Sequence, residues 1–172
     1  YHDVDEALNQ MHRYIHEQQY GDIFSTLQIL VGMTPHDAKY MARTTDEMFN
    51  KTFAFQWQRK EDNTPVLDWH EFTASMLSIP MAHQMATNYM ILDGTPRKQM
   101  IKVMRPYQVY AASSIIDKVR QHDFDINDQE IGYIWHATGS GKTISSFKTA
   151  WLASRLPNVD KVIFLVDRVA LT

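Results

Sequence analysis

The chain has 172 residues with 44% hydrophobic content and a net charge of −3, which is typical of a globular protein with one sizeable core or two small ones. The absence of cysteine excludes disulfides, cysteine zinc sites and thiol nucleophiles. Because no apolar run reaches the length of a bilayer span and no signal-like segment opens the chain, we expect a cytoplasmic protein with no membrane partner.

The first segment has the pattern of an amphipathic helix. Its apolar residues recur at helical spacing, at Val4, Leu8, Met11 and Ile15. Gln10 and Tyr14 flank this stripe four residues apart, so they can reach a common target, although a polar margin of the core explains them equally well. His12 and His16 share the spacing of a metal-binding pair, but no third ligand accompanies them and we interpret them as surface histidines.

Short strands and helices are predicted next. Residues 26–31 and 39–42 have the pattern of two strands joined by a turn through Gly32 and residues 35–37, and residues 53–57 of a third strand. Asp68 is a candidate N-cap, with Glu71 three residues later, for a helix ending near Leu77. Pro80 is suited to the first turn of a methionine-rich helix ending near Leu92. These elements predict an α/β region.

A break at residues 93–96 coincides with a change in charge. Residues 1–96 carry 6 basic against 13 acidic side chains, and residues 97–172 carry 11 against 7. We therefore predict a domain boundary there. Residues 99–104 then have the pattern of a strand, and Pro106 opens a helix whose apolar face comprises Val109, Ala112, Ile116 and Val119.

Residues 136–143, His-Ala-Thr-Gly-Ser-Gly-Lys-Thr, form a phosphate-binding loop of the Walker A type. Gly139 and Gly141 remove side-chain bulk so that backbone N–H groups can converge on phosphates at a helix N-terminus. Lys142 supplies a mobile charge for the β- and γ-phosphates, and the Thr143 hydroxyl is placed to ligate Mg²⁺. The candidate ATP-binding residues here are Thr138, Gly139, Ser140, Gly141, Lys142 and Thr143. His136 occupies the place of the first glycine in the strict pattern.

The surroundings of the loop favour nucleotide binding over an ordinary flexible loop. An apolar run at residues 131–135 precedes it, helical periodicity follows over residues 143–155, and a second apolar run occupies residues 162–166. Continuous apolar runs are typical of strands buried on both faces of a parallel sheet. Strand, loop, helix and strand thus occur in the order of a βαβ unit.

Residues 105–108, Arg-Pro-Tyr-Gln, resemble the adenine-reading Q motif of superfamily 2 helicases. The resemblance implies that Gln108 pairs with the adenine edge, for which an amide offers both a donor and an acceptor, and that Arg105 belongs to the same ATP site. Residues 166–168 look like helicase motif Ia, which implies that Arg168 lies against the DNA backbone.

A closer resemblance is to the motor and endonuclease (R) subunit of type I restriction enzymes. Residues 105–111, 132–136 and 161–168 are similar to that family, and residues 9–14 are similar to its Q-x-x-x-Y element. The resemblance implies that Gln10 and Tyr14 support a Mg²⁺-dependent nuclease site. It also implies the C-terminal part of a restriction-endonuclease-like α/β domain at residues 1–78, a connecting helix and linker at 79–96, and the first part of a RecA-like parallel-sheet lobe at 97–172.

The family's metal-binding acidic residues and catalytic lysine would precede Tyr1, and its acidic ATPase box would follow Thr172. We therefore expect an internal fragment, inactive alone, of an ATP-dependent DNA translocase and endonuclease. Its cofactors would be ATP and Mg²⁺, and its partners double-stranded DNA and the modification and specificity subunits. Two alternatives are another superfamily 2 helicase or translocase without a nuclease and a non-catalytic nucleotide-binding module.

Overall fold

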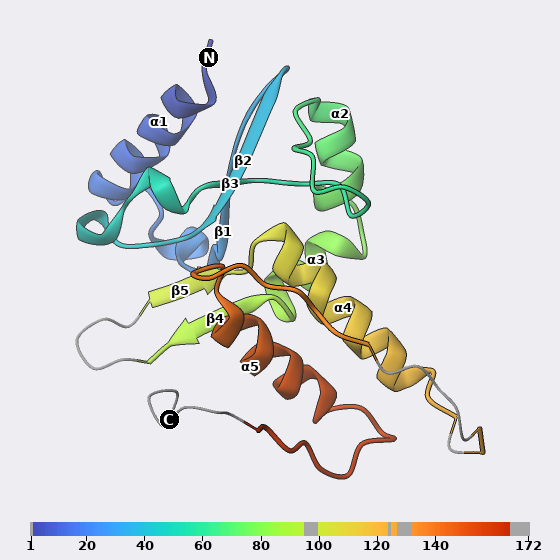
Figure 1. Cartoon of the computed structure of the whole chain (residues 1–172). Helices are drawn as coiled ribbons and strands as arrows, with labels where there is room; N and C mark the ends of the chain where they lie inside the picture. Colours follow the sequence, from blue (N-terminus) through green and yellow to red (C-terminus); the bar gives the residue numbers. More distant parts are fainter. Residues whose placement is uncertain (1, 95–99, 124, 127–131, 166–172) are drawn as a thin grey trace. The chain divides into compact units, whose positions relative to one another are not determined.

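The chain forms two compact units, Tyr1–Pro106 and Tyr107–Thr172, here called the N-terminal and C-terminal units. The computed structural model in Figure 1 describes residues 2–94, 100–123, 125–126 and 132–165. Helices and two small sheets give a mixed α/β architecture. Within the ranges just given, no helix has both the length and the apolar character needed to cross a membrane.

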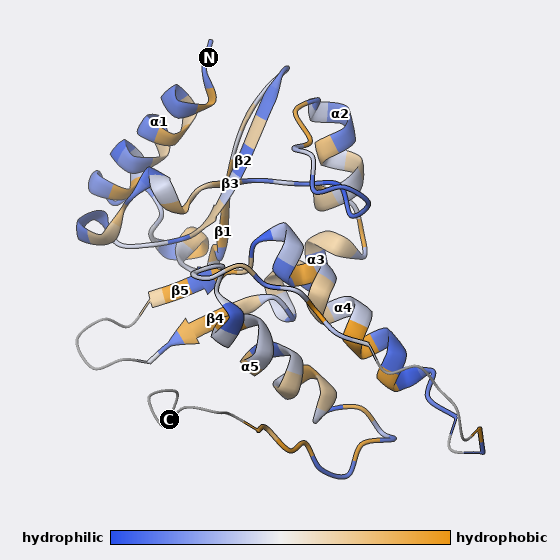
Figure 2. Cartoon of the chain, viewed as in Figure 1, coloured by the Kyte–Doolittle hydropathy of each residue, from blue (hydrophilic) through white to orange (hydrophobic). Residues whose placement is uncertain are grey.

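Helix α1 (Val4–His16) opens the N-terminal unit where an amphipathic helix is predicted. The carboxylate of Asp3 caps it by accepting a hydrogen bond of 3.0 Å from the backbone N–H of Asp5. Leu8 is fully buried with Leu30 and Met41, and Met11 and Ile15 pack against this cluster. The predicted core-facing stripe is therefore confirmed, and Figure 2 shows the hydrophilic residues of α1 beside it.

An antiparallel sheet of order β1-β2-β3 lies beside α1 (Figure 1). It comprises β1 (Ile29–Thr34), β2 (Asp37–Ala42) and β3 (Phe55–Gln56), with Ile29 opposite Ala42 and Thr34 opposite Asp37. Gly32 permits close approach of the helix, since a Cβ there would lie 3.3 Å from the Leu8 side chain and 3.5 Å from that of Val4.

The three predicted strands exist, but the predicted bounds of each differ from those in the structure. Asp22–Thr26 forms the 3₁₀ helix η1, so β1 begins at Ile29 and not at residue 26. Gly32 lies inside β1 because its missing side chain is needed against α1, and the turn is confined to residues 35–36. The third strand is shortened because Lys51–Phe53 forms another 3₁₀ helix, η3, capped by Asn50.

The aromatic part of the core surrounds Tyr40, which is completely buried. Its ring meets those of Phe55 and Trp57 edge-on at 6.2 and 5.9 Å between centroids. Its hydroxyl donates a hydrogen bond of 2.8 Å to the carbonyl of Met104. This bond connects β2 to the residue directly after β5 (Met100–Val103), a strand of the second sheet.

Two helical segments follow the first sheet. Helix α2 (Trp69–Phe72) begins after Asp68, whose carboxylate accepts hydrogen bonds from the backbone N–H groups of His70 and Glu71, as predicted. It continues as the π-helical segment η4 (Thr73–Leu77), which ends at the predicted position. Helix α3 (Met81–Thr87) then buries Met85.

The predicted extension of α3 to Leu92 is wrong, because β4 (Met90–Asp93) pairs antiparallel with β5 (Met100–Val103). Met90 lies opposite Val103 and Asp93 opposite Met100. The break at residues 93–96 therefore connects two strands of one sheet, and the compact units divide after Pro106.

The C-terminal unit contains helices α4 (Pro106–Arg120) and α5 (Lys142–Ala153), both close to their predicted bounds. Val109, Ala112 and Ile116 are buried on the predicted apolar face of α4. Beyond α5, the Asn158 side-chain amide donates a hydrogen bond of 2.9 Å to the carbonyl of Val119 at the end of α4. The two helices and their connections position the phosphate-loop sequence.

The two strands predicted around the phosphate loop do not form in the described residues. Residues 132–135 and 162–165 have no strand pairing and are drawn as coil in Figure 1. The side chains of Trp135 and Leu165 are 90% and 93% exposed. Ile131 and Val166 lie outside the described residues. The physical reason is that a strand needs neighbouring strands for its backbone hydrogen bonds, and the described part of the C-terminal unit contains none.

Candidate nucleotide-binding site

The phosphate loop has the backbone conformation that its glycines permit. Gly139 has φ +77° and Gly141 φ +80°, in the left-handed region that side chains disfavour. Helix α5 begins at Lys142, immediately after Gly141, and no side chain caps its N-terminus. The N–H groups of its first turn are therefore available to an acceptor such as a phosphate.

The predicted phosphate and metal contacts lie at this helix start. Lys142 and Thr143 are exposed on the first turn of α5, and Thr138 and Gly139 are exposed in the loop before it. A flexible ammonium and a hydroxyl thus stand beside N–H groups without a side-chain cap. This arrangement fits a polyphosphate with its divalent cation.

Two side chains of α4 hold the loop through its backbone. The phenol of Tyr107 donates a hydrogen bond of 2.8 Å to the carbonyl of Ser140. The amide Nε2 of Gln108 donates to the same carbonyl at 3.0 Å and to the carbonyl of Gly141 at 3.4 Å. Gln108 is only 4% exposed, and a Cβ at Gly141 would lie 2.4 Å from its Nε2. Adenine reading by Gln108 stays a prediction, while its contact with the loop is an additional role that sequence reasoning missed.

Ser140 and His136 form a second set of contacts within the loop. The Ser140 hydroxyl donates to the carbonyl of Ala137 at 2.7 Å and lies 3.0 Å from Nδ1 of His136. The His136 ring meets that of Tyr107 edge-on, with 6.4 Å between centroids. His136, which occupies the place of the first glycine, is therefore hydrogen-bonded to a later residue of the same loop.

A pair of cations shares one indole on α5. Nζ of Lys148 lies 4.0 Å from the Trp151 ring centroid, and the guanidinium carbon of Arg155 lies 3.7 Å from it. Burial lowers the pKa of Lys148, and the charge of Arg155 lowers it further. No pattern in the sequence marked this group.

Of the two arginines predicted to bind ligands, the structure describes Arg105 but not Arg168. Arg105 lies in the N-terminal unit, with its guanidinium carbon 4.7 Å from the centroid of the Phe55 ring. Arg168, the predicted DNA contact, lies outside the described residues. Both functional roles stay predictions.

Gln10 and Tyr14 lie on the outer part of α1. The side-chain oxygen of Gln10 accepts a hydrogen bond of 2.6 Å from Arg13. Tyr14 is 37% exposed, and its ring meets that of Tyr20 edge-on with 6.1 Å between centroids. Neither side chain belongs to the apolar cluster that packs around Leu8, and the burial of the two differs: Gln10 is partly exposed and Tyr14 is exposed.

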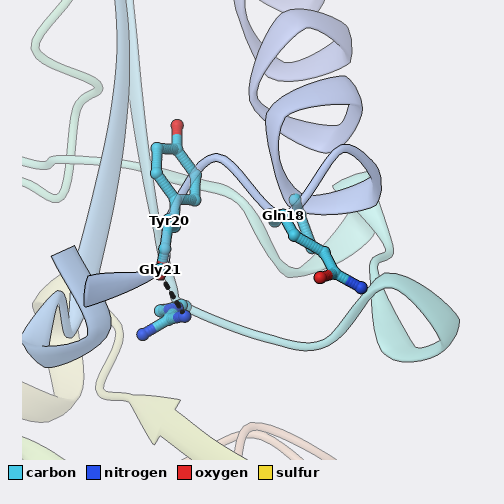
Figure 3. A pocket seen from close by; sticks show the side chains of 5 residues that line it. Gln18, Tyr20 and Gly21 are labelled. Carbon is cyan, nitrogen blue, oxygen red and sulfur yellow. Dashed lines mark hydrogen bonds between the residues drawn. The ribbon is translucent and has the colours of Figure 1, made fainter.

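A pocket of about 210 Å³ lies at the end of α1, lined by Ile15, Gln18, Tyr20, Gly21 and Arg43. Figure 3 shows the Tyr20 ring on one side and the Gln18 amide pointing away from it. Arg43 donates hydrogen bonds to the carbonyls of Tyr20 (2.9 Å) and Ser25, which holds the loop after α1. Burial raises the pKa of Tyr20, and the neighbouring Tyr14 raises it further.

His12 and His16 are joined by Asp46, a partner that sequence reasoning missed. Nε2 of His12 and Nδ1 of His16 each lie 2.8 Å from a different oxygen of Asp46. The Asp46 carboxylate raises the pKa of His16, and the hydrogen bond from His16 is the largest cause that lowers the pKa of Asp46. His12 also stacks on Phe49, with 4.3 Å between ring centroids. Across the described residues, no three His, Asp or Glu side chains are arranged to hold a metal ion.

Comparisons with known proteins match both parts of the chain. Residues 101–172 match the family described as type III restriction enzyme, res subunit. A type I restriction enzyme endonuclease subunit of Staphylococcus saprophyticus is 37% identical over 166 residues, which is 96% of this chain and 17% of that protein.

Two further relatives carry the same description. A putative type I restriction enzyme endonuclease subunit, C-terminal part, from Mycoplasma pneumoniae is 49% identical over 70 residues, which is 38% of this chain and 34% of that protein. A type I restriction enzyme endonuclease subunit of Escherichia coli is 34% identical over 120 residues, which is 68% of this chain and 37% of that protein. This chain thus spans only a minor part of the relatives that it matches.

Proposed function

This chain is homologous to the endonuclease subunits of type I restriction enzymes, and on that premise we propose that it binds ATP through the loop at residues 136–143. The larger protein that contains it would be an ATP-dependent DNA translocase and endonuclease. One observation carries the proposal: two glycines in the left-handed region lead directly into a helix whose N-terminus has no side-chain cap. Such a helix start provides N–H donors and a positive dipole end for phosphates.

Each residue of the site has a separate role in this proposal. Lys142 neutralises the β- and γ-phosphates, and the backbone of residues 138–141 surrounds them. Gln108 and Arg105 act at the adenine side. Thr143 would hold the Mg²⁺ that accompanies ATP, which offsets the charge on the phosphate oxygens when bound. The surrounding lobe of the larger protein would be RecA-like. Its other strands would supply the neighbours that the apolar runs on either side of the loop and helix lack in the described residues.

Gln10 and Tyr14 are proposed to support DNA cleavage by orienting the DNA backbone or a metal ligand through an amide and a phenol. Their accessibility on α1 supports this role. The described residues contain no carboxylate set that fits the nuclease Mg²⁺, so no catalytic step is assigned to them. The proposed partners are double-stranded DNA, contacted in part by Arg168, and the modification and specificity subunits, in the cytoplasm.

The decisive experiment replaces Lys142 in the endonuclease subunit that contains this chain. Lys142→Ala should abolish DNA-stimulated ATP hydrolysis, because a lost charge-assisted contact costs ~1.5 to 3 kcal/mol in binding and more in a transition state that builds charge on the same oxygens. Lys161→Ala is the matched control, since Lys161 is an exposed lysine of the same unit. Equal hydrolysis by both variants would remove the phosphate-loop assignment.

The same assays separate the proposal from its alternatives. Translocation without cleavage by the intact wild-type complex would indicate a superfamily 2 motor that lacks a nuclease. Nucleotide binding without hydrolysis, under conditions in which DNA and partner subunits are present, would indicate a non-catalytic binding module. Hydrolysis, translocation and cleavage together support the proposed function.

A further inference from the structure

Ser140 is held by every polar group that it has. Its backbone N–H donates to the carbonyl of Ala137 at 3.3 Å, and its hydroxyl donates to the same carbonyl at 2.7 Å. Its carbonyl accepts from the Tyr107 phenol and from the Gln108 amide. The turn from Ala137 to Ser140 is therefore bonded from two sides, by the loop itself and by α4.

The hydrogen-bond pattern also assigns a role to the His136 ring. Because the Ser140 hydroxyl donates its one proton to the carbonyl of Ala137, its oxygen can only accept a hydrogen bond from Nδ1 of His136, 3.0 Å away. The donor must then be an Nδ1–H, which fixes the tautomer of the neutral ring. A second proton on Nε2 would leave this Nδ1–H in place, so the contact is available to both charge states.

His136 and Tyr107 act on the same residue from different directions. His136 bonds the Ser140 side chain and Tyr107 its main chain, and the two rings meet edge-on. A glycine at position 136 could make neither the hydrogen bond nor the ring contact. His136 therefore restricts the backbone conformations at the start of the loop through these two contacts.

We propose that His136 is a positioning residue of the phosphate loop, which holds the Ala137–Ser140 turn through Ser140 so that the following N–H groups face a polyphosphate before it arrives. The inference rests on the proposed binding of ATP by this loop. Ordering the loop in advance lowers the entropy lost when the nucleotide binds, so the effect falls on nucleotide affinity. The effect would be independent of the base, because the loop would contact only the phosphates of the nucleotide.

The test measures the dissociation constants of ATP, ADP and GTP for variants of the intact subunit. His136→Ala should weaken all three nucleotides by a similar factor of about 3 to 10, the range for one neutral hydrogen bond. Ser140→Ala should weaken them by at least as much, because it also removes the hydrogen bond from the hydroxyl to the carbonyl of Ala137. His136→Asn places an amide N–H near the position of Nδ1 and should restore most of the affinity. His136→Gln places its amide at the position of Nε2 and should not.

A double variant and two controls make the outcome unambiguous. His136→Ala with Ser140→Ala should bind no more weakly than the weaker single variant, because both remove the same contact. Additive losses, wild-type affinity in His136→Ala, or equal behaviour of the Asn and Gln variants would each overturn the inference. Lys142→Ala tests the proposed function separately: if it binds ATP normally, the loop is not the nucleotide site. Melting temperatures identify any variant that has lost its fold, and His136→Asn still reports on the contact in that case.

Discussion

Gly141→Ala tests the packing of α4 against the phosphate loop. A Cβ at Gly141 would lie 2.4 Å from Nε2 of Gln108, so the amide has to move away from the carbonyls of Ser140 and Gly141. Gln108 is 4% exposed, and a buried amide that loses its partners costs ~1 to 3 kcal/mol. The left-handed backbone adds ~1 to 2 kcal/mol for any non-glycine residue.

Gly139→Ala is the matched control, because Gly139 has nearly the same φ, +77° against +80°, but no atom within 4 Å of a Cβ. Both variants carry the backbone strain, and only Gly141→Ala carries the clash. We expect Gly139→Ala to cost ~1 to 2 kcal/mol and Gly141→Ala a further ~1 to 3 kcal/mol in local opening free energy.

Hydrogen exchange without nucleotide measures this difference on the amides of α4 and α5, which report local opening of the unit separately from global unfolding. In a Gln108→Ala background the clash is absent, so Gly141→Ala should cost no more than Gly139→Ala. Equal protection in Gly141→Ala and Gly139→Ala, with Gln108 present, would refute the steric reasoning.

Three further predictions concern other residues. Gln108→Ala should weaken ATP by about 1 kcal/mol more than GTP, because only the contact with adenine distinguishes the two bases, and equal weakening in competition binding would contradict the adenine role. Gln10→Ala or Tyr14→Phe in the intact subunit should reduce DNA cleavage ~10- to 100-fold while translocation continues, and full cleavage by both would exclude the nuclease role. Asp46→Asn should flatten the pH dependence of stability. The raised pKa of His16 gives stability that is lost as the pH rises through this pKa, and the lowered pKa of Asp46 gives stability that is lost as the pH falls through that pKa. The contribution of the His16–Asp46 pair to the free energy of unfolding is therefore largest between about pH 4 and 6.5. Glu47→Gln, which removes a neighbouring exposed charge, should leave the pH profile unchanged.

The helices were predictable because their signals are local. The apolar spacing from Val4 to Ile15 and the proline at position 106 each predict a helix without knowledge of any distant residue. The phosphate loop belongs to the same class, since its glycines, lysine and threonine are adjacent in sequence. Their placement at the start of α5 follows directly from the motif.

The features that sequence reasoning missed depend on residues far apart in the chain. The methionine-rich segment after Pro80 has no clear period, and β4 forms there because residues 100–103 provide a partner strand. Asp46 lies 34 residues from His12 along the chain, and no residue close to the histidines in sequence predicts this partner. The strands predicted at residues 131–135 and 162–166 do not form in their described residues, 132–135 and 162–165, also because of distant residues. Their apolar pattern is local, but the neighbours that a parallel sheet requires are absent from the described part of the C-terminal unit.

The candidate site combines a conformation that is locally unfavourable with contacts that hold it in place. A helix start without a side-chain cap leaves N–H groups unsatisfied, and these same groups are what a phosphate would bind. A conventional serine or aspartate cap would stabilise α5 but would compete with the ligand. The hydrogen bonds from Tyr107, Gln108 and His136 instead act one residue earlier, mainly on Ser140. The loop is thus stabilised through carbonyls, which cannot donate to a phosphate, and through a hydroxyl whose one proton is already donated to Ala137, while the donors at the helix start stay available to the nucleotide.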